Sequence, residues 1–260
     1  MDERFRFVSD EADRAVLVRI KDIVSSAEKW RKPCFSLFLT EHEQAVIEQY
    51  FAYALNGNCS FFGGYDMAER RVFCAFPDEM TQNSFEYEDY PFKALTIILP
   101  KGYTLTHRDI LGSLMGLKIK RESVGDILIG ESYAVVFLLD AAAKLALSEL
   151  DKIGRVGVKC NLGLPEVLPA PYKLLECRGV VSSMRVDAIV SMLTDISRSE
   201  SARLINQGLV LRNAQVINST SKDISEGDKI SIRGYGKFKI ESIGGETRKG
   251  RLHIIYNKYI

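Results

Sequence analysis

Apolar residues recur every three or four positions from Ala12 to Trp30, a pattern that predicts an amphipathic helix. A second helix is expected to begin at Thr40, because Thr40 and Glu43 have the spacing of a capping box, and to end at Asn56-Gly57. The stretch FFGGYDMAERRVFCAF then predicts two short strands joined by a loop that contains glycine. Residues 1–80 are therefore expected to form a mainly helical segment with a short hairpin.

Strand and helix patterns alternate between residues 91 and 165. Thr106 and Asp109 have capping-box spacing at the start of the first helix, and Asp140 is expected to cap the second. The expected order is strand 93–99, helix 106–116, strands 126–129 and 133–139, helix 141–153 and strand 156–160. This β-α-β-β-α-β order is the ferredoxin-like arrangement. Many RNA-recognition modules share it, but so do many unrelated proteins, so by itself it gives no function.

A proline-rich stretch, LGLPEVLPAPY, then predicts a domain boundary. The part that follows is expected to hold two short helices and then several strands, with turns centred on Gly and Asp. The fold class predicted for the 260-residue chain is α+β, with three domains. Their expected limits are 1–80 for the helical segment, 91–165 for the ferredoxin-like domain and 180–260 for the C-terminal domain.

Charge is distributed unevenly along the chain, although its overall net charge is only +1. Residues 178–260 carry 14 Lys and Arg against 8 Asp and Glu, a net of +6. The rest of the chain carries 21 against 26, a net of −5. Such an asymmetry indicates that the C-terminal part faces an anion.

The cysteines and the N-terminus indicate a cytoplasmic protein. Five cysteines stand far apart with no C-x-x-C pair, which favours reduced thiols. None of the three histidines sits near a cysteine at ligand spacing, so no zinc site is expected. No other metal and no cofactor is expected either. The opening MDERFRFVSDEADR lacks the apolar core of a signal peptide, and no run approaches the length of a membrane span.

The most informative stretch runs from Arg185 to Phe238. Ser197–Glu200 has the form of a capping box, which places Arg198 and Ser199 at the first positions of a helix that Gly208 ends. The N–H groups and the dipole of such a helix start favour phosphate. Polar residues recur along one face of this helix, at Ser199, Arg203, Asn206 and Gln207.

The same stretch resembles the S-four RNA-binding domain, named after the fourth small-subunit ribosomal protein. The resemblance rests on R-x-D, S-R-S, L-I-x-x-G-x-V-x-x-N and G-D-x-I, which stand at Arg185–Asp187, Ser197–Ser199, Leu204–Asn213 and Gly227–Ile230. It implies that the second helix and the adjoining hairpin dock on folded RNA, through phosphates and sugars more than through bases. One departure is the hairpin turn, which is Asn213-Ala214 where Asn-Gly would be usual. Ala214 costs the turn some stability if this position needs a positive φ.

The expected RNA-binding residues follow from the helix start, the polar face, the hairpin and the nearby basic turns. They are Arg185, Ser197, Arg198, Ser199, Arg203, Asn206, Gln207, Arg212, Asn213, Lys222, Arg233 and Lys237. A structural alternative stays open for part of this set, because Arg185 and Asp187 can pair with each other and Asp187 can cap the first short helix. For Lys222, Arg233 and Lys237, simple solvation is equally compatible with the sequence.

Domain order extends the resemblance. A C-terminal S-four domain behind a βαββαβ unit, with HRDILGSLMGLKIKRESVGDI leading its first crossover, is similar to the YlmH family of bacterial RNA-binding proteins. Membership implies association with the large ribosomal subunit and the tRNA it holds, a role in rescue of stalled translation, and a genomic link to cell-division genes. The expected partners are thus ribosomal RNA and tRNA, with no membrane and no small-molecule substrate.

The sequence argues against three alternative functions. S-four domains often accompany pseudouridine synthases and methyltransferases, but residues 1–165 show neither a G-R-L-D-type loop nor a Gly-rich cofactor loop, so no enzyme is expected. A division scaffold on membranes would need an amphipathic basic helix, which the sequence lacks. Finally, the alternating residues Tyr133 to Leu139 could form a base-stacking platform, but packing against the N-terminal helices is favoured because the aromatic consensus is missing.

Overall fold

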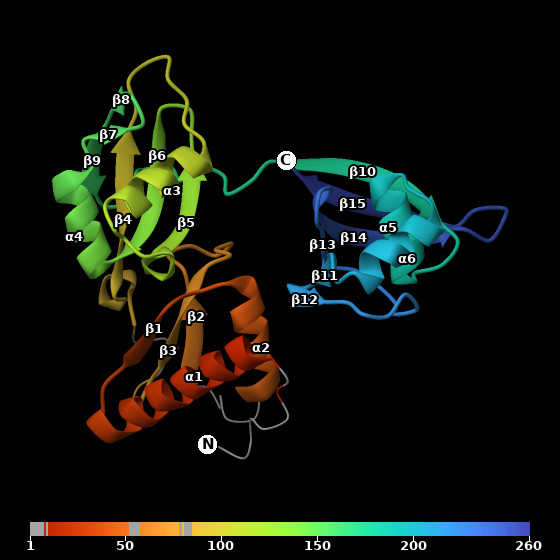
Figure 1. The fold of residues 1–260 in the computed structure, drawn as a ribbon, viewed down its shortest axis with the longest axis horizontal. Helices are drawn as coiled ribbons and strands as arrows, with labels where there is room; N and C mark the ends of the chain where they lie inside the picture. Colours follow the sequence, from red (N-terminus) through yellow and green to blue (C-terminus); the bar gives the residue numbers. More distant parts are fainter. Residues whose placement is uncertain (1–7, 9, 52–57, 78–79, 81–84) are drawn as a thin grey trace. The chain divides into compact units, whose positions relative to one another are not determined.

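The computed structural model describes residues 8, 10–51, 58–77, 80 and 85–260. The chain divides into two compact units, Met1–Pro171 and Tyr172–Ile260 (Figure 1). Both units combine helices with antiparallel sheets. The α+β class predicted from the sequence is confirmed.

The N-terminal part of the first unit is a three-stranded sheet in the order β1-β3-β2, with two helices packed on one face. The predicted hairpin is β2 with β3, whereas β1 is an additional strand that the periodicity of the sequence did not indicate. This part is therefore less dominated by helix than expected. The elements are α1 (Glu11–Trp30), β1 (Cys34–Leu39), α2 (Glu41–Phe51), β2 (Cys59–Phe62) and β3 (Arg71–Ala75).

Side-chain caps start both N-terminal helices. Asp10 accepts hydrogen bonds from the N–H groups of Ala12 and Asp13, at 2.8 and 3.2 Å, at the start of α1. The capping box expected before α2 is present, because the Thr40 N–H donates to Glu43 (2.8 Å) while the Glu43 N–H donates to Thr40 (3.2 Å). The end expected for this helix, Asn56-Gly57, lies outside the described residues.

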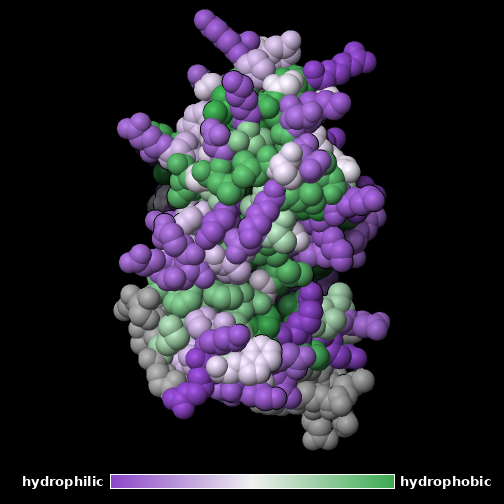
Figure 2. Space-filling view, turned by 90° about the vertical axis from the view of Figure 1, so that its left-hand side faces the viewer, coloured by the Kyte–Doolittle hydropathy of each residue, from purple (hydrophilic) through white to green (hydrophobic). Residues whose placement is uncertain are grey.

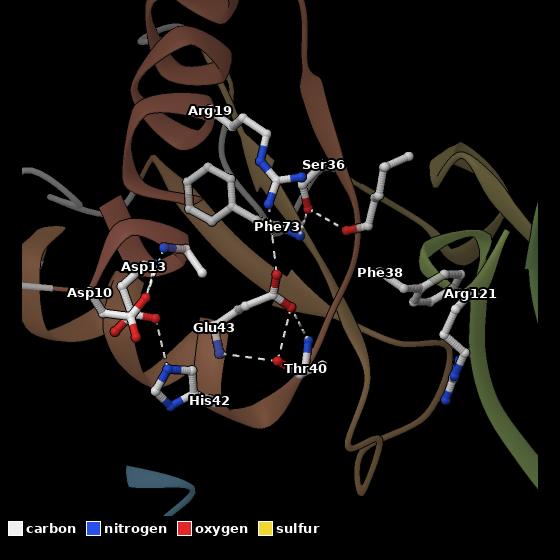
Figure 3. Close-up of polar contacts among 12 residues, drawn as sticks. Asp10, Asp13, Arg19, Ser36, Phe38, Thr40, His42, Glu43, Phe73 and Arg121 are labelled. Carbon is white, nitrogen blue, oxygen red and sulfur yellow. Dashed lines mark hydrogen bonds and ion pairs between the residues drawn. The ribbon is translucent and has the colours of Figure 1, made fainter. Parts of the chain in front are cut away.

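Polar contacts also join the two helices, as Figure 3 shows. His42 Nε2 lies 2.8 Å from Asp13 Oδ1, and Arg19 Nη2 lies 3.7 Å from Glu43 Oε1. Glu43 therefore serves both the cap of α2 and the pairing with α1. These contacts orient the helices over a core of apolar side chains that includes Leu17, Ile20 and Ile47.

The second part of the first unit is a four-stranded antiparallel sheet in the order β5-β6-β4-β9 with α3 and α4 on one face. This is the predicted ferredoxin-like arrangement, and the Thr106–Asp109 capping box is confirmed. Asp140 is the first residue of α4 rather than its cap, and a small hairpin turned at Gly154 follows that helix. The elements are η3 (Tyr87–Asp89), β4 (Phe92–Ile98), α3 (His107–Gly116), η4 (Arg121–Ser123), β5 (Val124–Ile129), β6 (Tyr133–Leu139), α4 (Asp140–Glu149), β7 (Lys152–Ile153), β8 (Val156–Gly157) and β9 (Lys159–Leu162).

The two sheets of the first unit pack against each other. Phe38 of β1 and Val72 of β3 meet Phe92, Val135 and Phe137 of the ferredoxin-like sheet in one buried cluster. The packing is close, because a Cβ added at position 125 would lie 2.7 Å from the Phe38 ring. The face of β6 that could have stacked bases is thus covered, as the sequence favoured, but by strands rather than by the expected helices.

Hydrogen bonds to Asp126 stabilise this contact between the two sheets. Its carboxylate accepts from the hydroxyl of Tyr65 (2.8 Å) and from the N–H groups of Glu69 (2.7 Å) and Arg70 (3.0 Å). Arg70 in turn donates from Nε to the carbonyl of Val124 at 2.8 Å. The loop before β3 is therefore tied to the start of β5.

The first unit keeps some apolar side chains at its surface. Figure 2 shows hydrophobic residues (green) lying between hydrophilic ones (purple) on the side that it draws. Large exposed apolar residues of this unit include Trp30, Leu145, Leu147 and Leu162. None of the helices in the described ranges has the length and hydropathy needed to cross a bilayer.

The second unit is a six-stranded sheet in the order β10-β15-β14-β13-β11-β12, with α5 and α6 packed on one face (Figure 1). Strand β10 pairs with β15 over its whole length, so the sheet begins before the expected limit at Val180. The elements are β10 (Leu174–Val181), α5 (Val186–Thr194), α6 (Arg198–Asn206), β11 (Val210–Arg212), β12 (Gln215–Val216), β13 (Lys229–Ile232), β14 (Gly236–Glu246) and β15 (Leu252–Tyr259).

Candidate nucleic-acid interface

The start of α6 lies where the sequence placed it, but only half of the predicted capping box is formed. Ser197 is the N-cap residue, and its hydroxyl accepts from the N–H of Glu200 at 3.2 Å. The carboxylate of Glu200 does not return to Ser197. It faces Arg203 instead, with Nε of Arg203 3.0 Å from Oε2. The helix start keeps its favourable dipole for an anion, while Glu200 compensates one of the cations beside it.

Arg185, Asp187 and Arg198 are brought together where α5 and α6 begin. Arg198 Nη2 donates to Asp187 Oδ2 at 2.8 Å, and Arg185 Nε donates to Oδ1 at 3.2 Å. Burial opposes ionisation of Asp187, but the hydrogen bonds from Arg198 and Arg185 hold its pKa below the usual value. The carboxylate is therefore charged at neutral pH, and the cluster carries one net positive charge.

Both arginines of this cluster keep an open side. The side chain of Arg185 is 44% exposed and that of Arg198 50%, whereas Asp187 is buried. Arg185 and Asp187 do pair with each other, as the structural alternative proposed, and Arg185 still keeps an exposed side. Asp187 does not cap α5, because Arg185 occupies the N-cap position and Asp187 accepts from Ala188 within the first turn.

The polar face predicted on α6 is formed. Ser199, Arg203, Asn206 and Gln207 are exposed, while Leu204 and Ile205 are buried in the core of the second unit. The exposed face continues from the helix start towards Gly208, whose φ of 69° ends the helix. A surface with these donors can contact phosphates and sugar hydroxyls.

The hairpin after α6 is a two-residue turn with left-handed backbone at both positions. Asn213 has a φ of 48° and Ala214 a φ of 64°, so the turn does need the positive φ at which Ala214 is unfavourable. Asn213 Nδ2 donates to Asp228 Oδ1 at 2.7 Å, and Asn213 Oδ1 accepts from the N–H of Lys229 at 2.9 Å. The motif contains both Asn213 and Gly227-Asp228, and these bonds give a structural reason for that combination.

Arg212 takes part in the same internal network. Its Nε lies 2.7 Å from Asp228 Oδ2 in an ion pair that is not aligned as a hydrogen bond, and its Nη1 donates to the carbonyl of Asp223 at 3.0 Å. Only 24% of its side chain is exposed. Arg212 and Asn213 therefore hold the turn in shape. Arg212 is largely covered, whereas Asn213 stays exposed.

Three further candidates lie on loops and strands around the helices. Lys222 is exposed beside the start of α5, where its carbonyl accepts from the N–H of Val186 at 2.9 Å. Arg233 is exposed beside the end of α6, where its N–H donates to the carbonyl of Leu209 at 3.0 Å. Lys237 is different, because its Nζ lies over the Tyr259 ring, 5.4 Å from the centroid.

Groups that could suggest catalysis have ordinary structural roles. Thr106 and Asp109, next to His107, bond each other at 2.6 Å within the cap of α3. All five cysteines are free thiols, and burial raises the pKa of Cys59 and of Cys160 to about 11, which makes them poor nucleophiles. Within the described ranges, no group of three or more His, Cys, Asp or Glu side chains is placed to hold a metal.

Comparison with known proteins identifies two domains of the chain. The family model of the YlmH RNA-binding domain matches residues 86–163, and that of the S4 domain matches residues 184–230. The "Ribosome-associated protein quality control protein P2" of Bacillus subtilis (strain 168) is 31% identical over 222 residues, which are 85% of each chain. The chain belongs to the YlmH family.

A solved structure shows the fold of this family. The "Cell division protein ylmH from Streptococcus pneumoniae" is 22% identical, covers 60% of this chain and 93% of its own, and superposes with a TM-score of 0.50. The two matched domains of the YlmH family coincide here with the ferredoxin-like sheet and with the α5–α6 part of the second unit. The resemblance drawn from the sequence motifs is confirmed.

Proposed function

We propose that this chain is a non-catalytic protein that binds structured RNA on the large ribosomal subunit, together with the tRNA held there. The observation that carries the proposal is the cluster of Arg185, Asp187 and Arg198, which fixes two half-exposed guanidinium groups where α5 and α6 begin. Guanidinium groups bind phosphate in a bidentate manner. The exposed donors along α6 extend this surface, so several consecutive phosphates can be contacted.

A role in rescue of stalled translation is the second part of the proposal. It is supported by the name of the Bacillus subtilis relative, which places that protein in ribosome-associated quality control. A ribosome-bound role would place the protein in the cytoplasm. A link to cell division is supported only by the name of the Streptococcus pneumoniae structure and is proposed as secondary.

The RNA-binding part can be tested with the full chain, purified large ribosomal subunits and unfractionated tRNA. If about 4–6 phosphates are neutralised, log K should fall with log[salt] at a slope of a few units. Arg198→Ala and Arg203→Ala should each weaken binding by roughly 1–3 kcal/mol. Lys173→Ala is a matched control, since Lys173 is exposed in the same unit. Parent-like binding by both arginine variants would show that the α6 surface is not the interface.

The non-catalytic part needs a separate test. A methyltransferase would bind S-adenosylmethionine, which stabilises any protein that holds it in the folded state. We expect no change in melting temperature when the full chain is heated with this cofactor. A clear rise would overturn the proposal that RNA binding is the whole activity.

A further inference from the structure

Every arginine of the S4 motif lies against an acidic side chain, although two of them share one carboxylate. Arg185 and Arg198 share Asp187, and Arg203 faces Glu200. Arg212 is paired in the same way with Asp228. The surface recognised from the motif therefore carries less net charge than its arginines suggest. A strongly anionic ligand such as RNA would need further cations nearby.

Uncompensated cations lie on the hairpin between β14 and β15. Its tip carries Arg248, Lys249 and Arg251, all exposed. Across the described part of the chain, none of the three has an ion pair, although Glu246 stands just before them. The tip thus contributes a net charge of about +2 in six residues. It also lies beyond residues 184–230, the part matched by the S4 family model.

The hairpin tip has a defined shape. The N–H of Thr247 donates to the carbonyl of Arg251 at 2.7 Å, and the Thr247 hydroxyl accepts from the N–H groups of Lys249 (3.3 Å) and Arg251 (3.1 Å). Gly250 supplies the left-handed position with a φ of 68°. The three cations are therefore carried on a closed loop, whose backbone is held by its own hydrogen bonds.

A pocket of about 450 Å³ lies between this hairpin and the two helices. Arg251 lines it together with Arg198, and Ser182, Ser191 and Asp195 contribute polar groups. The sheet register accounts for the position of Arg251, because the next residue, Leu252, pairs with Val181 at the end of β10, where the chain turns into α5. Two arginines from distant parts of the sequence thus face one pocket.

We propose that this pocket takes the ribose and phosphate of one nucleotide of the bound RNA. Arg198 and Arg251 bind the phosphate, and Asp195 accepts a hydrogen bond from a ribose hydroxyl, which a bare anion would not offer. The volume of the pocket is within the range of small-ligand sites. Arg248 and Lys249 then follow the adjoining backbone. This inference rests on the proposed function and adds a contact that the S4 motif does not contain.

The test compares Arg251→Ala with Lys173→Ala in the full chain. Both residues are exposed and both changes remove one positive charge, but Lys173 precedes β10 at the end opposite the hairpin, roughly 26 Å along the strand. Binding to fluorescent unfractionated tRNA is measured by anisotropy over a salt series, and binding to large subunits by sedimentation. We expect Arg251→Ala to weaken binding about threefold to tenfold and to lower the salt slope by about 1. Lys173→Ala should stay within about twofold of the parent.

The outcomes separate this inference from the proposed function. If Arg251→Ala binds like the parent while Arg198→Ala does not, the nucleotide pocket is wrong and the S4 surface stands. Equal losses in Arg251→Ala and Lys173→Ala would mean diffuse charge and would also overturn the pocket. If the parent itself binds neither RNA, the proposed function fails. Binding of Arg251→Ala to anionic lipid vesicles is measured as well. If this variant keeps RNA binding and loses only vesicle binding, the pocket is wrong and the hairpin is reassigned to membranes. Melting curves should show Arg251→Ala and Lys173→Ala folded like the parent, since both side chains are exposed.

Discussion

Arg198 of α6 donates a hydrogen bond to Asp187 of α5 across 2.8 Å, and this contact holds the starts of the two helices side by side. Asp187 is buried, and it also accepts from Arg185. One carboxylate therefore aims two guanidinium groups at solvent. It also lowers the net charge of the surface that they form. The S4 motif therefore supplies two arginines together with the carboxylate that positions them.

Asp187→Asn should destabilise the second unit. The neutral amide keeps the size of the side chain but loses the charge-assisted bonds to both arginines, which we expect to cost about 1–3 kcal/mol. The measurement is urea unfolding of the full chain at neutral pH. Asp195→Asn is the matched control, because Asp195 is exposed and has a φ of 56° that Asn tolerates well. A loss of stability as large in Asp195→Asn would contradict this assignment.

The stabilisation by Asp187 should depend on pH. Burial opposes its ionisation, but Arg198 and Arg185 lower its pKa in the folded state, so the folded value lies below the unfolded value of about 3.9. Such a group stabilises the fold above the unfolded pKa and loses this effect as pH falls through the folded pKa. The stability gap between parent and Asp187→Asn should therefore be full at about pH 7 and shrink below about pH 4. A gap that widened in acid would have the wrong sign.

Glu200→Gln should strengthen RNA binding while it weakens the fold slightly. The change removes the negative charge that faces Arg203, so we expect about twofold to fivefold tighter binding to tRNA. The first turn of α6 loses a favourable charge, at a cost of about 0.3–1 kcal/mol. Anisotropy and urea unfolding measure the two effects. Glu176→Gln, on β10 and also paired with an arginine, should change neither by a comparable amount. Weaker binding by Glu200→Gln would show that Arg203 does not face RNA.

Local signals in the sequence predicted much of the fold. The capping boxes at Thr40 and Thr106 placed two helix starts correctly, because each is formed by residues only three apart. Strands β1 and β10 were missed because nothing local defines them. Cys34 pairs with Ala75 and Leu174 with Tyr259, so these strands form only when distant partners are present. The domain limits at 1–80, 91–165 and 180–260 stay predictions.

The candidate site was predictable in position but not in electrostatics. The motif placed Arg185, Arg198 and Arg203 on one part of the second unit, and the structure agrees. Which acid each arginine faces depends on side-chain conformation and on how α5 packs against α6, and spacing does not determine either. The hairpin cations Arg248, Lys249 and Arg251 lie outside the motif, so they were not among the predicted RNA-binding residues. That Arg251 lines one pocket with Arg198 depends on the β10–β15 register, which spacing along the chain does not give.

Asp126→Ala should loosen the junction between the two sheets of the first unit. The change leaves the N–H groups of Glu69 and Arg70 without their acceptor, and it removes the bond from Tyr65. We expect a loss of about 2–4 kcal/mol in unfolding free energy. Tyr65→Phe is the matched control, since it removes one of the three bonds and should cost about 0.5–1.5 kcal/mol. Faster amide exchange of Phe73 and Cys74 would locate the effect, and equal losses in both variants would contradict the role of Asp126.

Ala214→Gly should stabilise the second unit without weakening RNA binding. Ala214 has a φ of 64° in a two-residue turn, where glycine is favoured because it has no Cβ. We expect a gain of about 0.5–1 kcal/mol in urea unfolding. Ala202→Gly, inside α6, is the control of opposite sign and should cost about as much. Because Asn213 and Asp228 keep their bonds, tRNA affinity should be unchanged. A destabilised Ala214→Gly variant would mean that the Ala214 side chain, and not its backbone angle, shapes the turn.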